Sequence, residues 1–292
     1  MKLPRMKDEY GQIAYPAALL ATFLWAVHPV WVTSVSYIVQ RMTSMAAMFY
    51  ILSLYLYLKA RTAEKTSSSL ALFIGCALAG LASLLTKENA VMLPASILLF
   101  DLILIRGATP DHLRKSAQVL ILPLLVIGVA GFLYTGGFAN AFKGYAVRDF
   151  TLLERLLTEP RVLFFYLSLL FYPIGSRLTL LYEIDVSRSL VDPWTTLPSI
   201  LLIVLIVAFA VYLVRRRPLI SFAILFFFLN HLVESSILPL ELAYEHRNYL
   251  PAMFLFVPVA QFILFAINHF SYKRTIQVLV SLAIVILLVG MG

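Results

Sequence analysis

A run of ionisable residues, Glu245, His246 and Arg247, stands between two strongly apolar segments of this sequence. Carboxylates and imidazoles are the side chains that most often transfer protons in active sites. An arginine presents several N–H donors in a fixed fork, which suits a phosphate or a carboxylate. These residue types in this setting predict a site that binds an anion and moves a proton. A solvated loop is the plain alternative.

Other ionisable residues occupy similar borders of apolar segments. Lys87 and Glu88 fill a tight corner between two such segments, and His28 and Arg41 are the two ends of the segment HPVWVTSVSYIVQR. Each also has a structural explanation. Lys87 and Glu88 could form a local ion pair near the outer surface. His28 could simply end a helix before proline, and Arg41 could be a snorkelling side chain. If they shared one cavity, it would be rich in cations and would suit a phosphate or diphosphate group.

The composition indicates which elements position these residues. Hydrophobic residues make up 61% of the chain and charged residues only 13%, with a mean hydropathy of +0.90. A soluble domain is about half apolar and about a quarter charged. We therefore predict an all-α, polytopic membrane protein that forms a single domain over residues 1–292. The single cysteine, Cys76, excludes an internal disulfide, and no nucleic-acid-binding motif is present.

About nine apolar segments are long enough to be transmembrane helices. We place them near residues 14–33, 43–58, 69–86, 89–105, 116–134, 197–214, 218–236, 250–267 and 275–291. A tenth apolar stretch, RVLFFYLSLLFYP at 161–173, is too short to cross a bilayer comfortably. We expect it to form an interfacial or re-entrant helix on the outer face.

The distribution of basic residues sets the expected orientation. With a cytoplasmic N-terminus, the basic loops KARTAEK, RRRP and YKR all face the cytoplasm, as the positive-inside rule requires. The net charge of +8 is then an orientation signal and not a footprint for nucleic acid. Four loops with ionisable groups fall on the outer side, and we number them 1 to 4: 28–41, 86–89, 135–196 and 234–251. Ionisable groups near a bilayer usually face a bundle interior or a wet cavity, so we expect the functional site there.

Four segments, taken in order, resemble one enzyme family. They are HPVWVTSVSYIVQRMTSMAAMFYILSLYLYLKAR, LLTKENAVMLPASILLFDLIL, LTEPRVLFFYLSLLFYPIGSRLTLLYEIDVSRSLVDP and YEHRNYLP. Over nearly the whole chain, the sequence resembles bacterial relatives of the transmembrane and tetratricopeptide-repeat O-mannosyltransferases, which belong to the GT-C superfamily of glycosyltransferases. The resemblance implies transfer of a sugar from a polyprenyl-phosphate carrier to a protein, lipid or glycan acceptor. The reaction would take place on the outer, periplasmic face of the bacterial inner membrane.

Particular positions match residues that recur on the outer face in this family. The resemblance implies that the lipid phosphate and substrate are bound by His28, Arg41, Lys87, Arg247 and Asp185, the last in YEID. It implies catalytic roles for Glu88, Glu245 and His246. It leaves a divalent metal open, with unknown ligands, and names no other cofactor. Membrane lipid and the sugar donor are the expected partners, and the acceptor is unknown.

The sequence departs from the family pattern at both ends. Only polar residues 1–12 precede the first apolar segment, where the family has a further span and an acidic outer loop. No helical-repeat segment follows the last apolar run. Trp31 and Thr33 replace a second His or Gln and a Glu in the motif that starts at His28. We expect a chain truncated at both ends or a paralogue without catalysis, and a transporter of lipid-linked glycans or a membrane scaffold stays an alternative.

Overall fold

Helices form all the regular secondary structure that the computed structural model describes. The described residues are 11, 13–109 and 142–270, with the isolated positions 111, 112, 114, 115, 118, 275, 278, 279 and 282. The predicted all-α class is therefore confirmed for them. The predicted spans 116–134 and 275–291 lie outside the described residues, apart from some of the isolated positions.

Fewer helices qualify as membrane spans than the nine predicted. Those long and apolar enough are Ile38–Arg61, Thr66–Thr86, Glu88–Arg106 and Thr196–Leu213. Ala14–Ala26 with Pro29–Ser36 makes a fifth if this pair, bent by 54°, counts as one span. The described residues thus support a helical membrane protein with four or five candidate spans.

The predicted span 14–33 is broken in the structure. Helix α2 (Ala14–Ala26) ends before His28, and the short elements η2 (Pro29–Trp31) and α3 (Val32–Ser36) follow. Proline disfavours helical geometry in the residue before it. His28 accordingly has an extended backbone, with φ −70° and ψ 125°. The proline thus ends the helix, as the plain explanation of His28 predicted.

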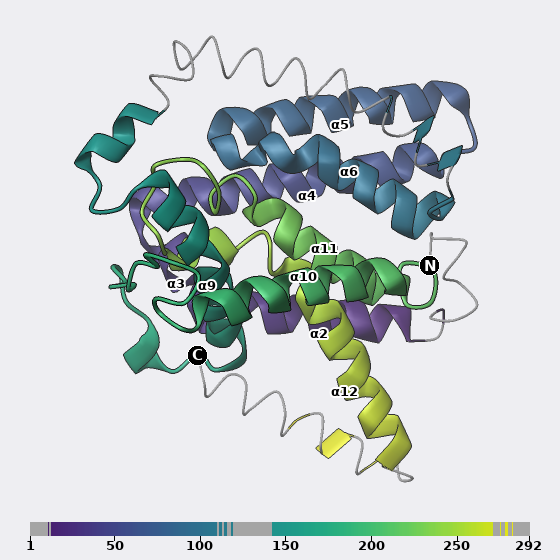
Figure 1. Cartoon of the computed structure of the whole chain (residues 1–292). Helices are drawn as coiled ribbons and strands as arrows, with labels where there is room; N and C mark the ends of the chain where they lie inside the picture. Colours follow the sequence, from purple (N-terminus) through teal and green to yellow (C-terminus); the bar gives the residue numbers. More distant parts are fainter. Residues whose placement is uncertain are drawn as a thin grey trace.

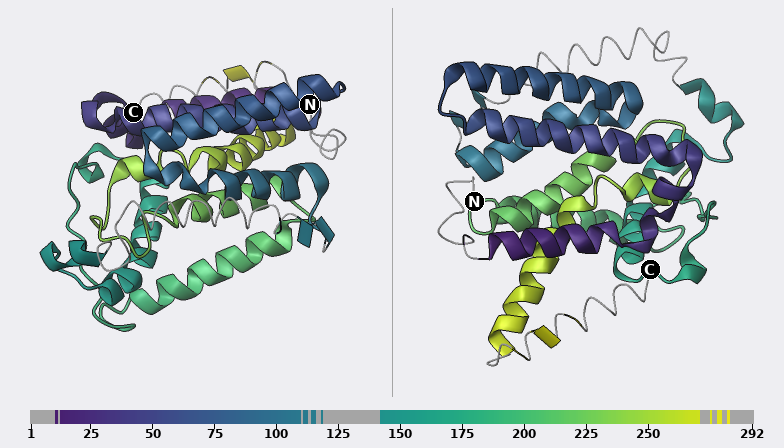
Figure 2. Two further views of the ribbon diagram at one scale, coloured as in Figure 1. Left: turned by 90° about the horizontal axis from the view of Figure 1, so that it is seen from above. Right: turned by 180° about the vertical axis from the view of Figure 1, so that it is seen from behind.

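Helices α4 (Arg41–Arg61) and α5 (Thr66–Thr86) form a long antiparallel pair, side by side in Figures 1 and 2. Ser53 Oγ donates to Cys76 O at 2.8 Å, and Ser83 Oγ donates to Ala46 O at 2.8 Å. Small and hydroxyl-bearing residues allow close approach of membrane helices and bond across them. The short element η3 (Ile38–Gln40) leads into α4. The third member of this layer comprises η4 (Glu88–Met92), α6 (Leu93–Phe100) and the π-helix η5 (Asp101–Arg106).

Helix α11 (Pro218–His231) lies between this layer and one that contains α2, α10 (Thr196–Leu213) and α12 (Phe256–Phe270) (Figure 1). Its buried aromatic residues pack against α4 and α6 of the first layer. Phe222 packs edge-on against Phe100, with ring centroids 5.6 Å apart, and Phe226 packs against Tyr50. The predicted span 218–236 is shorter than expected because the chain leaves the helix after His231. The predicted span 250–267 begins as the short turn η9 (Met253–Leu255) and continues into α12.

The predicted short helix 161–173 is the second half of a longer one. Helix α9 (Leu152–Phe171) has 20 residues and begins at a capping box: Thr151 Oγ1 accepts from the Glu154 N–H, and Glu154 Oε2 accepts from the Thr151 N–H. Its first half carries the buried charged residues Arg155 and Glu159. The helix ends at Phe171, before Pro173. Two further short turns, η6 (Lys143–Val147) and η7 (Gly175–Arg177), flank α9 in the chain.

Candidate functional site

The four polar loops meet beside the C-terminal end of α11. Thr33 of loop 1 donates from Oγ1 to Glu245 Oε2 of loop 4 over 3.4 Å. Lys87 Nζ of loop 2 lies 3.2 Å from Glu234 Oε1 of loop 4. Loop 3 contributes Arg155, which binds the backbone of loop 4. The expected convergence of these loops is therefore present. We use the name polar cluster for its buried ionisable residues, which are Lys87, Arg155, Glu159, Glu234, Glu245, His246 and Arg247.

Lys87 points into the protein and not toward the surface, which corrects our expectation for the corner 86–89. Its side chain is 4% exposed, it pairs with Glu234, and it also donates to Thr43 Oγ1 at 3.1 Å. Lys87 has an extended backbone that ends α5, and the following 3-10 turn begins at Glu88. Glu88 itself is exposed. The alternative of a local ion pair between these neighbours is therefore wrong.

Arg155 holds the backbone of loop 4 in place. Its guanidinium donates to the carbonyl oxygens of Glu234 at 2.7 Å and Ser236 at 3.0 Å, and to that of Leu240. It also forms an ion pair with Glu159, at 2.6 Å. An arginine has five N–H donors. The fully buried Arg155 uses most of them on carbonyl groups of loop 4, which lie outside any α-helix. We did not identify Arg155 and Glu159 from the sequence, although their i, i+4 spacing within an apolar run was a signal.

Glu159 is a buried carboxyl group with an altered acidity. It is 2% exposed, and its Oε2 atom makes no hydrogen bond to a described residue. Burial raises the pKa of Glu159 to about 7, although Arg155 and Arg247 act in the opposite direction. The group therefore titrates near neutral pH.

Glu245 lies at the start of η8 (Glu245–Asn248), a 3-10 turn whose residues are all buried. Its two carboxylate oxygens accept hydrogen bonds from the Tyr182 hydroxyl and from Thr33. Burial raises the pKa of Glu245, and these hydrogen bonds lower it by a smaller amount. A solvated loop, the plain alternative for these residues, is therefore wrong.

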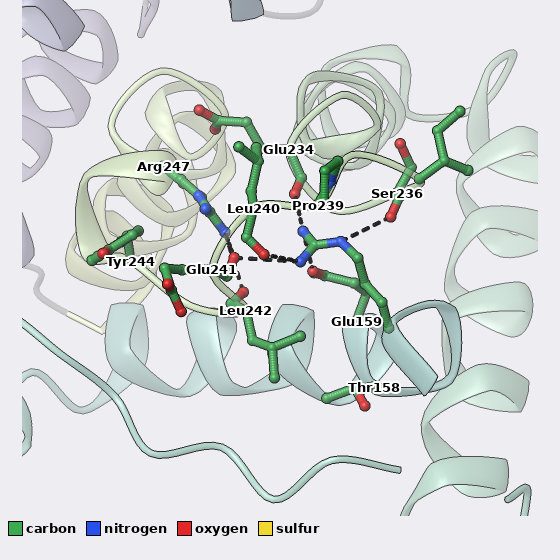
Figure 3. Close-up of polar contacts among 12 residues, drawn as sticks. Thr158, Glu159, Glu234, Ser236, Pro239, Leu240, Glu241, Leu242, Tyr244 and Arg247 are labelled. Carbon is green, nitrogen blue, oxygen red and sulfur yellow. Dashed lines mark hydrogen bonds and ion pairs between the residues drawn. The ribbon is translucent and has the colours of Figure 1, made fainter. Parts of the chain in front are cut away.

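His246 and Arg247 follow Glu245 into the interior. Burial, with the nearby positive charge of Lys87, lowers the pKa of His246 to about 3, so its imidazole is neutral at physiological pH. The imidazole stacks on the Tyr244 ring, with centroids 5.1 Å apart. Arg247 Nη1 donates to Glu241 O at 2.7 Å and to Leu242 O at 3.2 Å (Figure 3). Arg247 thus stabilises the same loop backbone as Arg155.

The remaining predicted residues lie around the polar cluster. His28 is half-buried, and its Nε2 lies 2.9 Å from Leu170 O. Arg41 is exposed and donates from Nε to Val35 O at 3.2 Å. Asp185 is exposed at a polar cleft of about 440 Å³ formed by residues 147–150, 181–186 and 241–244. The structure therefore brings Lys87, Glu245, His246 and Arg247 together and leaves Glu88, Arg41 and Asp185 at the surface.

The polar cluster is balanced in charge and not rich in cations as expected. Its cations are Lys87, Arg155 and Arg247, and its acids are Glu159, Glu234 and Glu245. The sequence-based list contained two of the cations but omitted Glu159 and assigned no role to Glu234. Because a buried charge without a partner is strongly destabilising, these acids are what allows the cations to be buried.

Two further observations complete the description of the site. Among the described residues, no group of three or more His, Cys, Asp or Glu side chains is arranged to hold a metal ion. Comparisons of the chain with protein-family models, with curated proteins and with solved structures find no match.

Proposed function

We propose that this chain is the membrane core of a GT-C type glycosyltransferase that uses a polyprenyl-phosphate-linked sugar. The observation that supports it best is an apolar cavity beside the polar cluster. A polyprenyl-phosphate sugar has the same two parts, a long apolar tail and a charged, polar head. In this proposal the tail occupies the cavity and the head faces the cluster.

The apolar cavity has a volume of about 490 Å³ and is lined by residues from α2, α9, α10, α11 and α12. His28 is the single polar side chain among its described lining residues. The wall residue Phe227 lies against His231, with ring centroids 4.4 Å apart, at the end of α11 that leads to Glu234. Five residues after His28, Thr33 reaches Glu245. The cavity therefore adjoins the polar cluster at two places, which are the C-terminal end of α11 and the segment that follows His28.

The chemistry assigned to the cluster is displacement at the anomeric carbon of the sugar. The acceptor hydroxyl forms the new C–O bond, the bond to the phosphate oxygen breaks, and the hydroxyl proton passes to a carboxylate. We assign this base role to Glu245 because Tyr182, whose hydroxyl binds it, is also a lining residue of the polar cleft, which offers the acceptor a path. Lys87 and Arg247 stabilise the charge on the departing phosphate. For this, the ammonium group of Lys87 has to leave the carboxylate of Glu234 and bind the phosphate instead.

The proposal includes the nine-span topology with a cytoplasmic N-terminus. The two ends of α4 support this orientation. Thr43, near its start, binds Lys87 of the polar cluster, whereas Arg61, at its end, pairs with Asp101. Arg106 and Arg215 also lie at that second end. Basic residues gathered opposite the polar cluster agree with the positive-inside rule, and they favour a cluster on the outer face of the bacterial inner membrane.

The test uses the full-length chain in phosphatidylcholine vesicles with polyprenyl-phospho-mannose as donor. We expect release of polyprenyl phosphate when a mixture of hydroxyl acceptors is added. Lys87→Met should abolish it, whereas Lys65→Met, at an exposed position before α5, should not. A non-catalytic scaffold is the second candidate because every charge of the polar cluster already has a partner in the protein or lies beside one. Absence of release with phospho-mannose and phospho-glucose donors alike would favour the scaffold.

A further inference from the structure

A second cavity lies on the other side of the molecule, along helices α5 and α6. Its volume is about 520 Å³. The lining residues are almost all apolar, and the charged ones gather at one end: Asp101, Arg106 and Lys115. None of the residues assigned to the polar cluster lines it. The cavity is thus separate from the proposed glycosyltransferase site.

Small residues on α5 create this space. Ala77 and Gly80 face the cavity between the larger residues Phe73 and Leu84, which line its two ends. A Cβ atom added to Gly80 would lie 2.8 Å from Leu93 Cδ2 of α6, so the two helices are in close contact at the floor of the groove. From Phe73 to Leu84 the groove follows α5 for roughly 16 Å. This length is about half of the roughly 30 Å hydrocarbon core, that is, one leaflet.

The charged end of the groove carries excess positive charge. Asp101 is buried and accepts from Arg61 Nε at 3.0 Å and from Arg106 Nε at 2.6 Å. Asp101 and Arg106 are the first and last residues of the π-helix η5, whose hydrogen bonds join residues five apart, and this brings the two side chains together. One carboxylate thus meets two guanidinium groups. Lys115, exposed at the same end, adds a further positive charge.

The contacts of Arg106 leave it able to bind a further anion. Its Nε pairs with Asp101 Oδ2 at 2.6 Å, and its side chain is 34% exposed. A guanidinium fork of this kind matches the oxygens of a phosphate. An apolar groove of one leaflet's length that ends at two cations has the shape and charge of an anionic lipid. A zwitterionic lipid lacks the net negative charge that this end attracts.

We propose that this groove binds one anionic glycerophospholipid, with an acyl chain along α5 and its phosphate on Arg106 and Lys115. The site concerns the resident membrane lipid and does not depend on the proposed sugar transfer. Bound lipid would fill the space between α5 and α6 and neutralise the excess charge beside Asp101. The lipid therefore stabilises the helical layer that carries Lys87 at its other end.

The test is native mass spectrometry of the full-length chain in detergent with equal concentrations of dioleoyl phosphatidylglycerol and dioleoyl phosphatidylcholine. We expect one phosphatidylglycerol to be retained in preference to phosphatidylcholine. Lys115→Gln should weaken this preference about fivefold, the effect of one basic residue near an anionic lipid surface. Ala77→Phe, which fills the groove without changing its charge, should abolish retention.

Matched controls separate the groove from general lipid adhesion. Lys65→Gln removes an exposed lysine that does not line the groove, and Ala71→Phe adds the same ring at an exposed α5 position outside it. Both should retain phosphatidylglycerol as the wild type does. Equal retention of the two lipids by the wild type would overturn the proposal. So would undiminished phosphatidylglycerol binding by Ala77→Phe, which would place the lipid elsewhere. The assay contains no sugar donor, so its outcome is independent of the glycosyltransferase test.

Discussion

Removing Lys87 alone should destabilise the protein more than removing it together with Glu234. The ammonium and carboxylate lie 3.2 Å apart, with side-chain exposures of 4% and 8%, so solvent screens their attraction little. Lys87→Met leaves Glu234 buried beside fewer positive charges. Loss of one partner of a buried pair costs about 3–5 kcal/mol in the free energy of unfolding, whereas replacing both by apolar residues of similar volume is often nearly neutral.

The assay is a double-mutant cycle on the full-length chain in detergent. Unfolding of Lys87→Met, Glu234→Met and the double variant is followed by tryptophan fluorescence. We expect each single variant to lose about 3–5 kcal/mol and the double variant to recover most of this loss. Lys65→Met, at an exposed position, should stay within about 0.5 kcal/mol of the wild type. If the losses of the two single variants simply add in the double variant, the pair is not coupled and our account of Lys87 is wrong.

Three further predictions concern the neighbours of this pair. Arg155→Met should reduce stability by more than about 3 kcal/mol, because three carbonyl groups and Glu159 lose their partner; unfolding in detergent measures the loss, and a change below about 1 kcal/mol would contradict it. Burial raises the pKa of Glu159 above its unfolded value, so its contribution to stability should be present at pH 4 and lost as pH rises to about 7. The difference in free energy of unfolding between the wild type and Glu159→Gln should show this loss between pH 4 and pH 8, because the titration of Glu245 and His246 is common to both proteins; a difference that stays constant over this range would contradict it. Tyr182→Phe removes a hydrogen bond that lowers the pKa of Glu245, so the pH profile of the transfer reaction should move to higher pH; an unchanged profile would exclude Glu245 as the base.

Composition and apolar segment length predicted the helical class and most of the helix positions. The predicted segments 43–58 and 69–86 differ from α4 and α5 by a few residues, because long apolar runs between polar loops leave little freedom in where a helix lies. The convergence of the loops also followed from the sequence, since the orientation rule placed them all on one side. Both results depend on properties averaged over many residues.

Predictions that depend on single side chains were less successful. The direction of Lys87 could not be predicted, because it depends on Glu234, a residue from a distant segment, and on the extended backbone at the end of α5. The start of α9 was missed because Arg155 and Glu159 interrupt its apolar pattern. Their burial becomes understandable only when loop 4 supplies the carbonyl groups that Arg155 binds. Tertiary contacts of this kind leave no periodic signal in the sequence.

The pairing of Lys87 with Glu234 also bears on the biogenesis of the protein. About half of the chain separates the two residues, so the ribosome releases the α4–α5 hairpin long before the partner of Lys87 exists. During that interval the ammonium group has to stay in water or with lipid headgroups, because a lone charge is costly in the bilayer. The hairpin can therefore insert early, but the polar cluster closes only after loop 4 has been synthesised. A nascent chain arrested before Glu234 should expose Lys87 to aqueous amine reagents, and the finished protein should protect it.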